Sequence, residues 1–218
     1  MGMKSYSFLF LMFFIVASIT NIQICLADCD NVKDTCPTTE KQGTLFINGL
    51  PCKDQGNTSA HDFKSMELSK AGPRDAFGAS VNIVNASTFP GLNSLGLSIG
   101  RSDMEVDGIV NLHNHPRATE MVFVWEGTVV AGFLDTQNKL FQKSLKAGDV
   151  FVIPKGLFHF FLNRGVGVAT VFSVFNSQNP GVGSLTSGVT LESLSDSQLV
   201  GANDFTSLFS DIIYSQKN

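Results

Sequence analysis

Between residues 77 and 176 the sequence consists of short apolar runs separated by turn residues. The runs include ASVNIVNA, GIVNLHNH, EMVFVWEG and TVVAGFLD, and the separators include FPGLN, DTQNK, KAGD and NRG. Many short strands at close, regular spacing favour an antiparallel sandwich or barrel. The same stretch lacks the 3.6-residue apolar period of an amphipathic helix. We therefore predict an all-β domain over this part of the chain.

The two ends of the chain have a different character. Near the start, Lys4 precedes the apolar run FLFLMFFIVASI, which is shorter than the ~20 residues of a membrane-spanning helix and is typical of a secretory signal peptide. We predict that residues 1–27 form this signal, and that there is no membrane span. Near the other end, Asn203 is a candidate N-cap for an amphipathic helix that packs either on its own domain or on a neighbouring subunit. Its apolar face would consist of Phe205, Leu208, Phe209, Ile212 and Ile213.

The composition narrows the range of partners. The formal net charge is −4 and no basic run occurs, so neither nucleic acid nor an acidic membrane surface is expected to bind. Charged residues make up 16% of the chain and hydrophobic residues 43%. This balance indicates additional buried surface, as between subunits. The mature chain is long enough for one domain with its own core.

The secretory route permits disulfides and glycans. After loss of the signal, Cys29, Cys36 and Cys52 remain, and three cysteines cannot all pair within one chain. A bond that closes the 36–52 loop would stabilise the fold by roughly 3 kcal/mol and leave Cys29 free or linked to another chain. Two glycosylation sequons begin at Asn57, in a polar stretch, and at Asn85, which is flanked by apolar residues.

Two of the four histidines lie one residue apart in HNHPRATE, residues 113–120. In a strand His113 and His115 point to the same face, so both imidazoles can converge on one metal ion, for which histidine is the commonest side-chain ligand. Pro116 interrupts strand pairing. The turn PRAT interrupts the alternation of side chains between the two faces of the strand. Glu120 can therefore begin a new strand with its side chain directed to the same interior as the two histidines.

His159 lies in the strand-like run LFHFFLN, after the turn PKG. It shares one strand face with Phe161 and Asn163, and a histidine among apolar residues needs a polar partner. A metal ion or a backbone hydrogen bond would serve, and the run by itself favours the backbone. The fourth histidine, His61, lies in a polar segment and is expected to be exposed.

The stretches GIVNLHNHPRATEMVFVWEG and GDVFVIPKGLFHFFLN resemble the two cupin motifs of germins and germin-like proteins. The first contains His-x-His, four residues, Glu, six residues and Gly. The second contains Gly, five residues, Pro-x-Gly, two residues, His, three residues and Asn. NGLPCK, FPGLNSLGLSIGRSD and FNSQNPG are also similar to the family, so the resemblance covers nearly the whole mature chain up to residue 184.

This resemblance implies a single cupin jelly-roll β-barrel with a short helical C-terminal extension. The expected parts are an N-terminal extension with a disulfide loop (28–72), the barrel (73–184) and a C-terminal helical segment (185–218). The resemblance also implies the Cys36–Cys52 bond. The family's proteins bind manganese through three histidines and one carboxylate, and the matching residues here are His113, His115, Glu120 and His159.

The residues around this expected site bear on its chemistry. Germins proper are oxalate oxidases, and two asparagine amides are thought to orient their substrate. Here those positions are Gly100 and Val110, with Asn111 adjacent, so a dicarboxylate loses its orienting donors. Phe161 stands where the family often has glutamine, and this leaves Asn163 or water as the expected second layer of a proton route.

The resemblance therefore implies superoxide dismutase-type activity on a small anion or dioxygen species, and not oxalate oxidation. The alternative is a non-enzymatic extracellular protein that binds a ligand or belongs to the cell wall. In either case the family implies secretion to the apoplast, a role in plant defence and a homo-oligomer, namely a hexamer built as a trimer of dimers. The tail after FNSQNPG departs from the family and is shorter.

Overall fold

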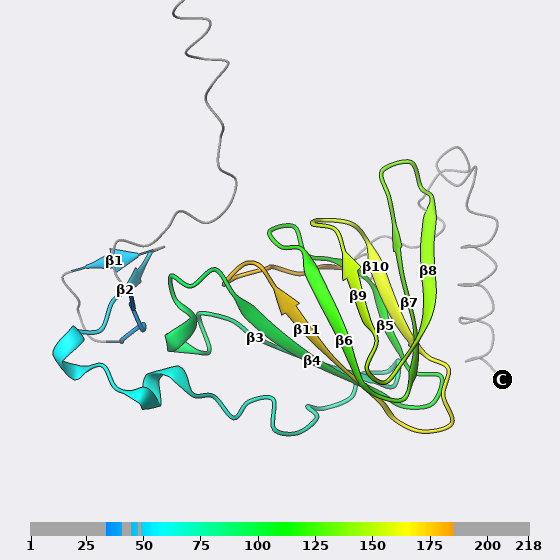
Figure 1. Cartoon of the computed structure of the whole chain (residues 1–218), viewed down its shortest axis with the longest axis horizontal. Helices are drawn as coiled ribbons and strands as arrows, with labels where there is room; N and C mark the ends of the chain where they lie inside the picture. Colours follow the sequence, from blue (N-terminus) through cyan, green and yellow to red (C-terminus); the bar gives the residue numbers. More distant parts are fainter. Residues whose placement is uncertain (1–33, 41–44, 48, 185–218) are drawn as a thin grey trace, which may run out of the picture. The chain divides into compact units, whose positions relative to one another are not determined.

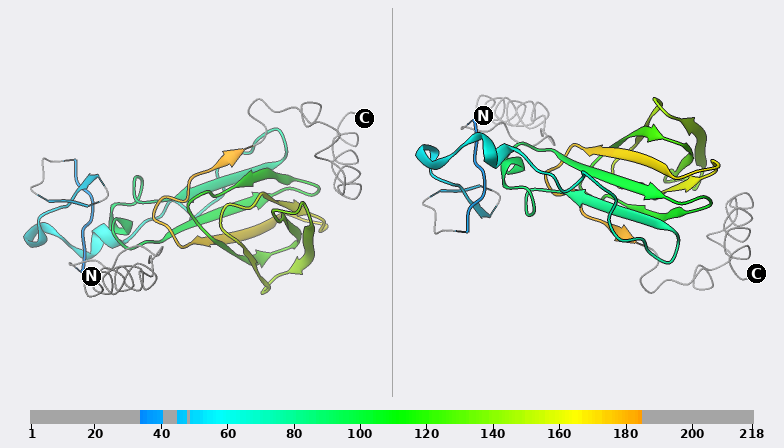
Figure 2. Two further views of the ribbon diagram at one scale, coloured as in Figure 1. Left: turned by 90° about the horizontal axis from the view of Figure 1, so that it is seen from above. Right: turned by 90° about the horizontal axis from the view of Figure 1, so that it is seen from below.

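The structure, a computed structural model, describes residues 34–40, 45–47 and 49–184. The predicted signal peptide, Cys29 and the predicted C-terminal helix lie outside these residues. Within them, most of the chain forms two antiparallel five-stranded sheets, drawn in Figure 1 and from two further sides in Figure 2. The prediction of an all-β domain is confirmed.

The first sheet has the strand order β12-β5-β10-β7-β8 and the second has the order β3-β4-β11-β6-β9. Each apolar run quoted above contains one of these strands, because the turn residues between the runs interrupt the pairing. The strands of the first sheet are β12 (Gly183–Ser184), β5 (Ile109–Asn114), β10 (His159–Asn163), β7 (Thr128–Leu134) and β8 (Leu140–Lys146). Those of the second are β3 (Ala79–Val84), β4 (Ser98–Met104), β11 (Ala169–Phe175), β6 (Glu120–Glu126) and β9 (Val150–Ile153).

The main core consists of the side chains that the strands bury on one face. In β6, Val122 and Val124 are buried, and they pack with Met104, Phe161 and Val171 from three other strands. Each such side chain contributes about 1.5–3 kcal/mol when it is fully removed from water. The period-2 alternation of β6 thus decides which residues form the core and which face outward.

The outward faces of β6 and β9 are also apolar. Along β6 the alternate residues Met121, Phe123 and Trp125 are exposed, and Val150 and Val152 of the neighbouring β9 are exposed too. On β10 the residues that alternate with His159 and Phe161 belong to a second buried cluster, which consists of Ile109, Leu112, Phe160 and Leu162. Apolar residues on both faces account for the high hydrophobic content of the sequence.

A small N-terminal region precedes the sheets. It contains the two-stranded pair β1 (Phe46–Ile47) and β2 (Leu50–Pro51), and short 3-10 helices η1 (Gln55–Asn57) and η2 (Ala60–Phe63); a third, η3 (Pro90–Leu92), follows β3. The sequence patterns predicted none of these short elements. No helix among the described residues combines the length and hydropathy needed to cross a membrane.

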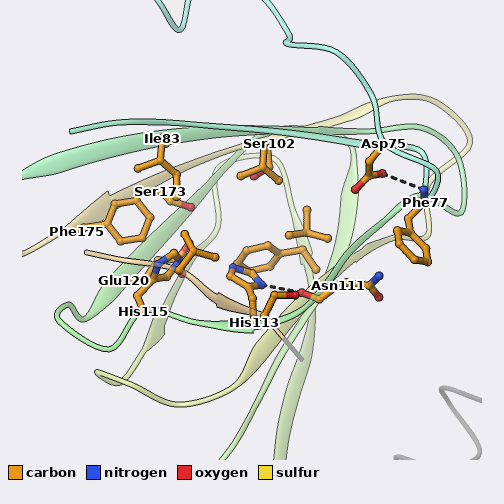
Figure 3. Close-up of a pocket in the computed structure, with 16 residues that line it drawn as sticks. Asp75, Phe77, Ile83, Ser102, Asn111, His113, His115, Glu120, Ser173 and Phe175 are labelled. Atoms are coloured by element: carbon orange, nitrogen blue, oxygen red, sulfur yellow. Dashed lines mark hydrogen bonds and ion pairs between the residues drawn. The ribbon is translucent and has the colours of Figure 1, made fainter. Parts of the chain in front are cut away.

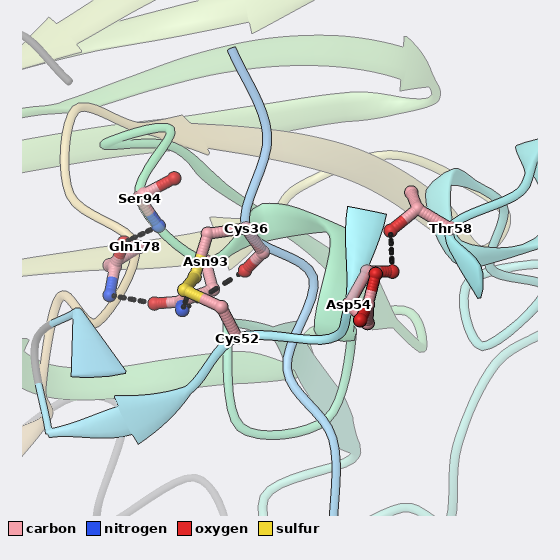
Figure 4. Close-up of a disulfide and its surroundings, with 7 residues drawn as sticks. All are labelled: Cys36, Cys52, Asp54, Thr58, Asn93, Ser94 and Gln178. Atoms are coloured by element: carbon pink, nitrogen blue, oxygen red, sulfur yellow. Dashed lines mark hydrogen bonds between the residues drawn. A yellow bond between two sulfur atoms is a disulfide. The ribbon is translucent and has the colours of Figure 1, made fainter. Parts of the chain in front are cut away.

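The predicted disulfide between Cys36 and Cys52 is confirmed, with a Cα–Cα distance of 4.9 Å (Figure 4). The Asn93 side-chain amide donates a hydrogen bond to the Cys36 carbonyl at 3.1 Å, and the Gln178 amide donates to Asn93 Oδ1 at 3.1 Å. These bonds connect the disulfide region to the segments that precede β4 and follow β11. The N-terminal region is thereby fixed by both covalent and polar contacts.

The two sequons differ in their surroundings. Asn57 is exposed at the end of η1, whereas Asn85 is half-buried and its Oδ1 accepts hydrogen bonds from the backbone N–H and hydroxyl of Ser87. Glycosylation stays a prediction, with Asn57 as the more accessible site. His61 is exposed, as predicted.

Candidate metal centre

The four predicted ligand residues lie together although they come from different strands. His113 belongs to β5 and pairs directly with His159, the first residue of β10. His115 follows the end of β5, and after the turn at Pro116 the next strand, β6, begins at Glu120. The phase reset expected from PRAT therefore occurs, and it turns the Glu120 side chain toward the histidines (Figure 3).

The four side chains are within reach of a single ion. Their ligand atoms all lie within 4.8 Å of one another. Nε2 of His159 is 2.8 Å from Oε2 of Glu120, and Nε2 of His115 is 3.4 Å from the same oxygen. The ring centroids of His113 and His159 are 4.1 Å apart. All four residues are buried, so the cluster is shielded from bulk water.

All three imidazoles are held in the same tautomer. In each ring Nδ1 lies at hydrogen-bonding distance from a backbone carbonyl, and a carbonyl oxygen only accepts, so Nδ1 must carry the proton. Each Nε2 then keeps its lone pair for a ligand in the centre of the cluster. The three bonds are His113 to the Asn111 carbonyl at 2.7 Å, His115 to the Gly181 carbonyl at 2.6 Å, and His159 to the Leu157 carbonyl at 2.9 Å.

Two of the inward-facing atoms lack hydrogen-bond partners. Oε2 of Glu120 and Nε2 of His159 are fully buried, and despite their 2.8 Å separation neither has a partner of acceptable hydrogen-bond geometry. Buried polar groups are otherwise almost always paired. Two facing acceptors need a cation between them, and imidazole nitrogen with carboxylate oxygen suits a first-row divalent metal. The residues present therefore fit a metal ion.

The electrostatic environment keeps these residues ready to bind a cation. Burial, with a smaller contribution from the neighbouring His159, lowers the pKa of His113 to about 3. Burial also lowers the pKa of His115. For Glu120, burial acts to raise the pKa, but the close approach of His159, together with His115 and Ser173, outweighs it and the net pKa is lowered. At neutral pH the imidazoles of His113 and His115 are thus neutral and the Glu120 carboxylate is ionised, as metal ligands require.

A pocket of about 260 Å³ opens beside the cluster (Figure 3). Gly100, Val110 and Asn111, the positions considered above for oxalate, all line it, and Phe161 and Phe175 form part of its apolar wall. No Lys or Arg occurs among its described lining residues. An anion in this pocket would therefore depend on a bound cation for its charge partner.

The two residues predicted as a second layer have different positions. The Phe161 ring lies against the site, with its centroid 5.7 Å from that of His159. Asn163 is not among the described pocket-lining residues, and it is four residues farther along β10, or about 13 Å. Its amide is already used in hydrogen bonds to backbone carbonyls. These hydrogen bonds connect β10 to the segments at residues 104–105 and 167, and a role for Asn163 in a proton route stays a prediction.

The sequence patterns missed two contributors to the site. Ser173 helps to lower the pKa of Glu120, and its place in phase with Val171 and Phe175 on β11 was a usable signal, because a serine there faces the interior. The carbonyl of Gly181 left no such signal, since any residue type carries one.

Two antiparallel sheets with a buried cluster of three histidines and one glutamate define the cupin class of protein. The sequence model of the Cupin family matches residues 67–206. Germin-like protein subfamily 3 member 4 of Arabidopsis thaliana is 52% identical over 173 residues, which cover 78% of this chain and 82% of that relative. The chain belongs to the germin-like proteins of the cupin family.

Solved structures show the same fold. Oxalate oxidase in complex with the substrate analogue glycolate is similar with a TM-score of 0.69 and 34% identity, over 81% of this chain and 90% of that one. Peruvianin-I, described as a cysteine peptidase from Thevetia peruviana latex, is similar with a TM-score of 0.67 and 38% identity, over 72% of this chain and 97% of that one. An oxalate oxidase and a cysteine peptidase thus share this fold, so the fold alone does not determine the chemistry of this chain.

Proposed function

We propose that this germin-like protein is secreted to the apoplast or cell wall, acts in plant defence, and binds manganese through His113, His115, Glu120 and His159. We further propose superoxide dismutase-type activity at this centre. The observation that carries the proposal is the convergence of three imidazoles and one carboxylate, with every Nδ1 at hydrogen-bonding distance from a backbone carbonyl. Manganese is inferred from the family resemblance, because the donor set by itself would also suit copper or zinc.

A bound manganese ion would supply one-electron redox chemistry. The residues of this chain hold the ion by four ligands, and burial keeps the imidazole lone pairs available. The pocket is large enough for a diatomic anion. Ser102, Asn111 and Ser173 are polar residues of its lining, and water bound to them would bring the protons that dismutation consumes.

The pocket does not favour oxalate. A dicarboxylate needs donors for both ends, but Gly100 and Val110 have no polar side chain, and Asn111 is the one amide among the described lining residues. Failure to pair the carboxylate oxygens would weaken oxalate binding strongly. We therefore propose that the protein is not an oxalate oxidase.

A non-enzymatic binding or structural role is the second candidate. It is supported by the apolar wall of the pocket, where the Phe175 ring centroid lies 4.6 Å from that of His115 and the Phe161 ring faces His159. Neither ring can donate or accept a proton. In this case the ion would fix a ligand or stabilise the barrel without turnover.

The deciding experiment combines metal analysis with turnover of the purified, secreted protein. We expect about one manganese per chain and superoxide dismutation that is lost on chelation, with no peroxide formed from oxalate. His113→Gln should lose both manganese and turnover, and His61→Gln, at the exposed histidine, is the matched control. Manganese without turnover would favour the non-enzymatic role. A protein that binds no first-row metal would refute the site.

We also propose that the protein is a homo-oligomer, and that it is a hexamer built as a trimer of dimers. The exposed apolar face of β6 and β9 supports association, since Trp125 is 63% exposed and Val150 is 55% exposed, and soluble monomers rarely leave such patches uncovered. Light scattering of Trp125→Arg should show smaller species. Truncation before Asn203 tests separately whether the predicted C-terminal helix, outside the described residues, holds the assembly together.

A further inference from the structure

The three imidazoles of the metal centre are oriented in two different ways. His113 and His159 donate to carbonyls two residues earlier in their own strands or adjoining turns. His115 donates to the Gly181 carbonyl, 66 residues away in sequence. Local strand geometry therefore accounts for two tautomers, whereas the third depends on how a remote segment is held in place.

Arg117 binds this segment directly before Gly181, and the pairing of β12 with β5 holds it directly after. Its Nε donates to the Asn179 carbonyl at 2.7 Å, its Nη2 donates to Asn179 Oδ1 at 3.0 Å, and its backbone N–H donates to the Pro180 carbonyl at 3.1 Å. Three bonds thus fix the two residues immediately before Gly181. The guanidinium is in turn two residues from His115 along the chain, so one turn carries both the ligand and the contact that orients it.

The conformation of Gly181 agrees with this arrangement. Its φ is +70°, a conformation that glycine adopts without strain. A Cβ atom built on it would lie 2.7 Å from Nη2 of Arg117. The guanidinium therefore packs directly against the glycine backbone, and the position requires a glycine for both its dihedral angle and the close approach.

Without the Gly181 carbonyl, His115 has an alternative tautomer that competes with a metal ion. Nε2 of His115 lies 3.4 Å from Oε2 of Glu120. If the ring proton moved from Nδ1 to Nε2, that nitrogen would donate to the carboxylate, and two ligand atoms would satisfy each other instead of an ion. The carbonyl prevents this by accepting from Nδ1.

We propose that Arg117 is a positioning residue for the metal centre. Its guanidinium holds residues 179–181 so that the Gly181 carbonyl keeps the Nε2 lone pair of His115 directed at the ion. This inference rests on the proposed metal binding, but its effect on the His115 tautomer exists in the metal-free protein as well.

The test uses the full secreted chain, with Arg117→Ala, Arg117→Lys and the control Arg164→Ala. Arg164 is an exposed arginine like Arg117, and it pairs with Asp107. Ring-nitrogen NMR of histidine-labelled, metal-free protein reports the tautomers, and titration with Mn²⁺ alone reports affinity. We expect Arg117→Ala to give His115 a population with the proton on Nε2, to leave His113 and His159 unchanged, and to lower Mn²⁺ affinity about tenfold. Arg117→Lys should restore part of both, and Arg164→Ala should behave as the wild type.

Wild-type ring-nitrogen signals in Arg117→Ala would overturn the proposal, as would an equal shift in all three histidines, which would indicate general loosening. If Arg117→Ala does not fold, Asn179→Ala removes the Oδ1 contact from the other side, and unchanged His115 signals there would overturn the proposal too. A wild-type protein that binds no Mn²⁺ would refute the proposed function, while the tautomer measurement would still decide the role of Arg117.

Discussion

Strand β10 carries a buried polar residue at each end, His159 and Asn163, on the same face. The two side chains differ in how completely they are hydrogen-bonded. Asn163 is completely buried, and its amide nitrogen donates to the carbonyls of Met104, Glu105 and Gly167, while its Oδ1 accepts from the Gly165 N–H. His159 is equally buried, but only its Nδ1 is hydrogen-bonded. Its Nε2 faces a carboxylate oxygen that also lacks a partner.

This difference separates a structural end of the strand from a functional one. A fold normally satisfies its buried polar groups, because each unsatisfied group costs about 1–3 kcal/mol. The Asn163 end obeys this rule and connects β10 to two loops. The His159 end does not obey it, because among the described residues Nε2 of His159 and Oε2 of Glu120 have no hydrogen-bond partner. A site that is completed by a metal ion would leave these two atoms unpaired in the protein alone. The contrast identifies the site without reference to any relative.

The largest effect should come from removing the ligand at the functional end. His159→Ala deletes one of the four expected ligands. This should lower the metal affinity by more than the roughly 10–100-fold that follows from loss of a residue that only hydrogen-bonds a ligand. We expect a loss of about 1,000-fold in Mn²⁺ affinity, or about 4 kcal/mol, with the metal-free fold intact by circular dichroism. His61→Ala is the matched control. If His159→Ala kept the wild-type affinity for Mn²⁺, His159 would not be a metal ligand, and the proposed functional end of β10 would be refuted.

The structural end should respond in the opposite way. Asn163→Ala leaves backbone carbonyls and the Gly165 N–H without their partner, and we expect the free energy of unfolding to fall by about 3 kcal/mol. Urea denaturation in the presence of a chelator measures this. Folded Asn163→Ala should bind Mn²⁺ within about threefold of the wild type, because Asn163 does not line the pocket. A loss of affinity comparable to that of His159→Ala would contradict the division of β10 into two ends.

The pH dependence of the metal-free protein sharpens the comparison. The pKa of His113 is lowered to about 3 in the folded state, so between pH 6.5 and 3 the unfolded chain binds the extra proton and stability falls as pH falls. We expect a loss of about 2 kcal/mol from pH 6.5 to 5. Thermal melts of chelated protein check this. The slope should be reduced in His113→Gln and retained in Asn163→Ala, and an unchanged slope in His113→Gln would exclude His113 as its source.

The smallest effect on the metal should come from Phe161, which lies between the two ends. Phe161→Gln replaces a ring that touches the site but offers no ligand atom. We expect Mn²⁺ affinity to change less than tenfold, with a loss of about 1–2 kcal/mol in stability from burying an amide. Manganese titration and urea denaturation measure the two. An affinity loss near that of His159→Ala would show that the apolar wall, and not the ligand set, dominates binding.

The period-2 alternation of strands made much of the site predictable. It placed His113 and His115 on one face, predicted that Phe161 would share the face of His159, and, with the break at Pro116, predicted the inward direction of Glu120. The same alternation put Asn163 on the face of the ligands, which is correct, but it could not give the distance to the pocket or the partners of the amide. The role of Asn163 at the site therefore stays a prediction.

What the sequence determined by itself was therefore local, namely the strands and their buried faces. The carbonyls that accept from Nδ1 of His113 and His159 are local as well, since they lie two residues away. Only the tertiary structure decided which strands became neighbours. It brought the Gly181 carbonyl to His115 across 66 residues and gave Asn163 partners 58 and 59 residues away. The physical reason is that side-chain periodicity reports which face a residue occupies, whereas hydrogen-bond partners depend on contacts between segments that no local pattern encodes.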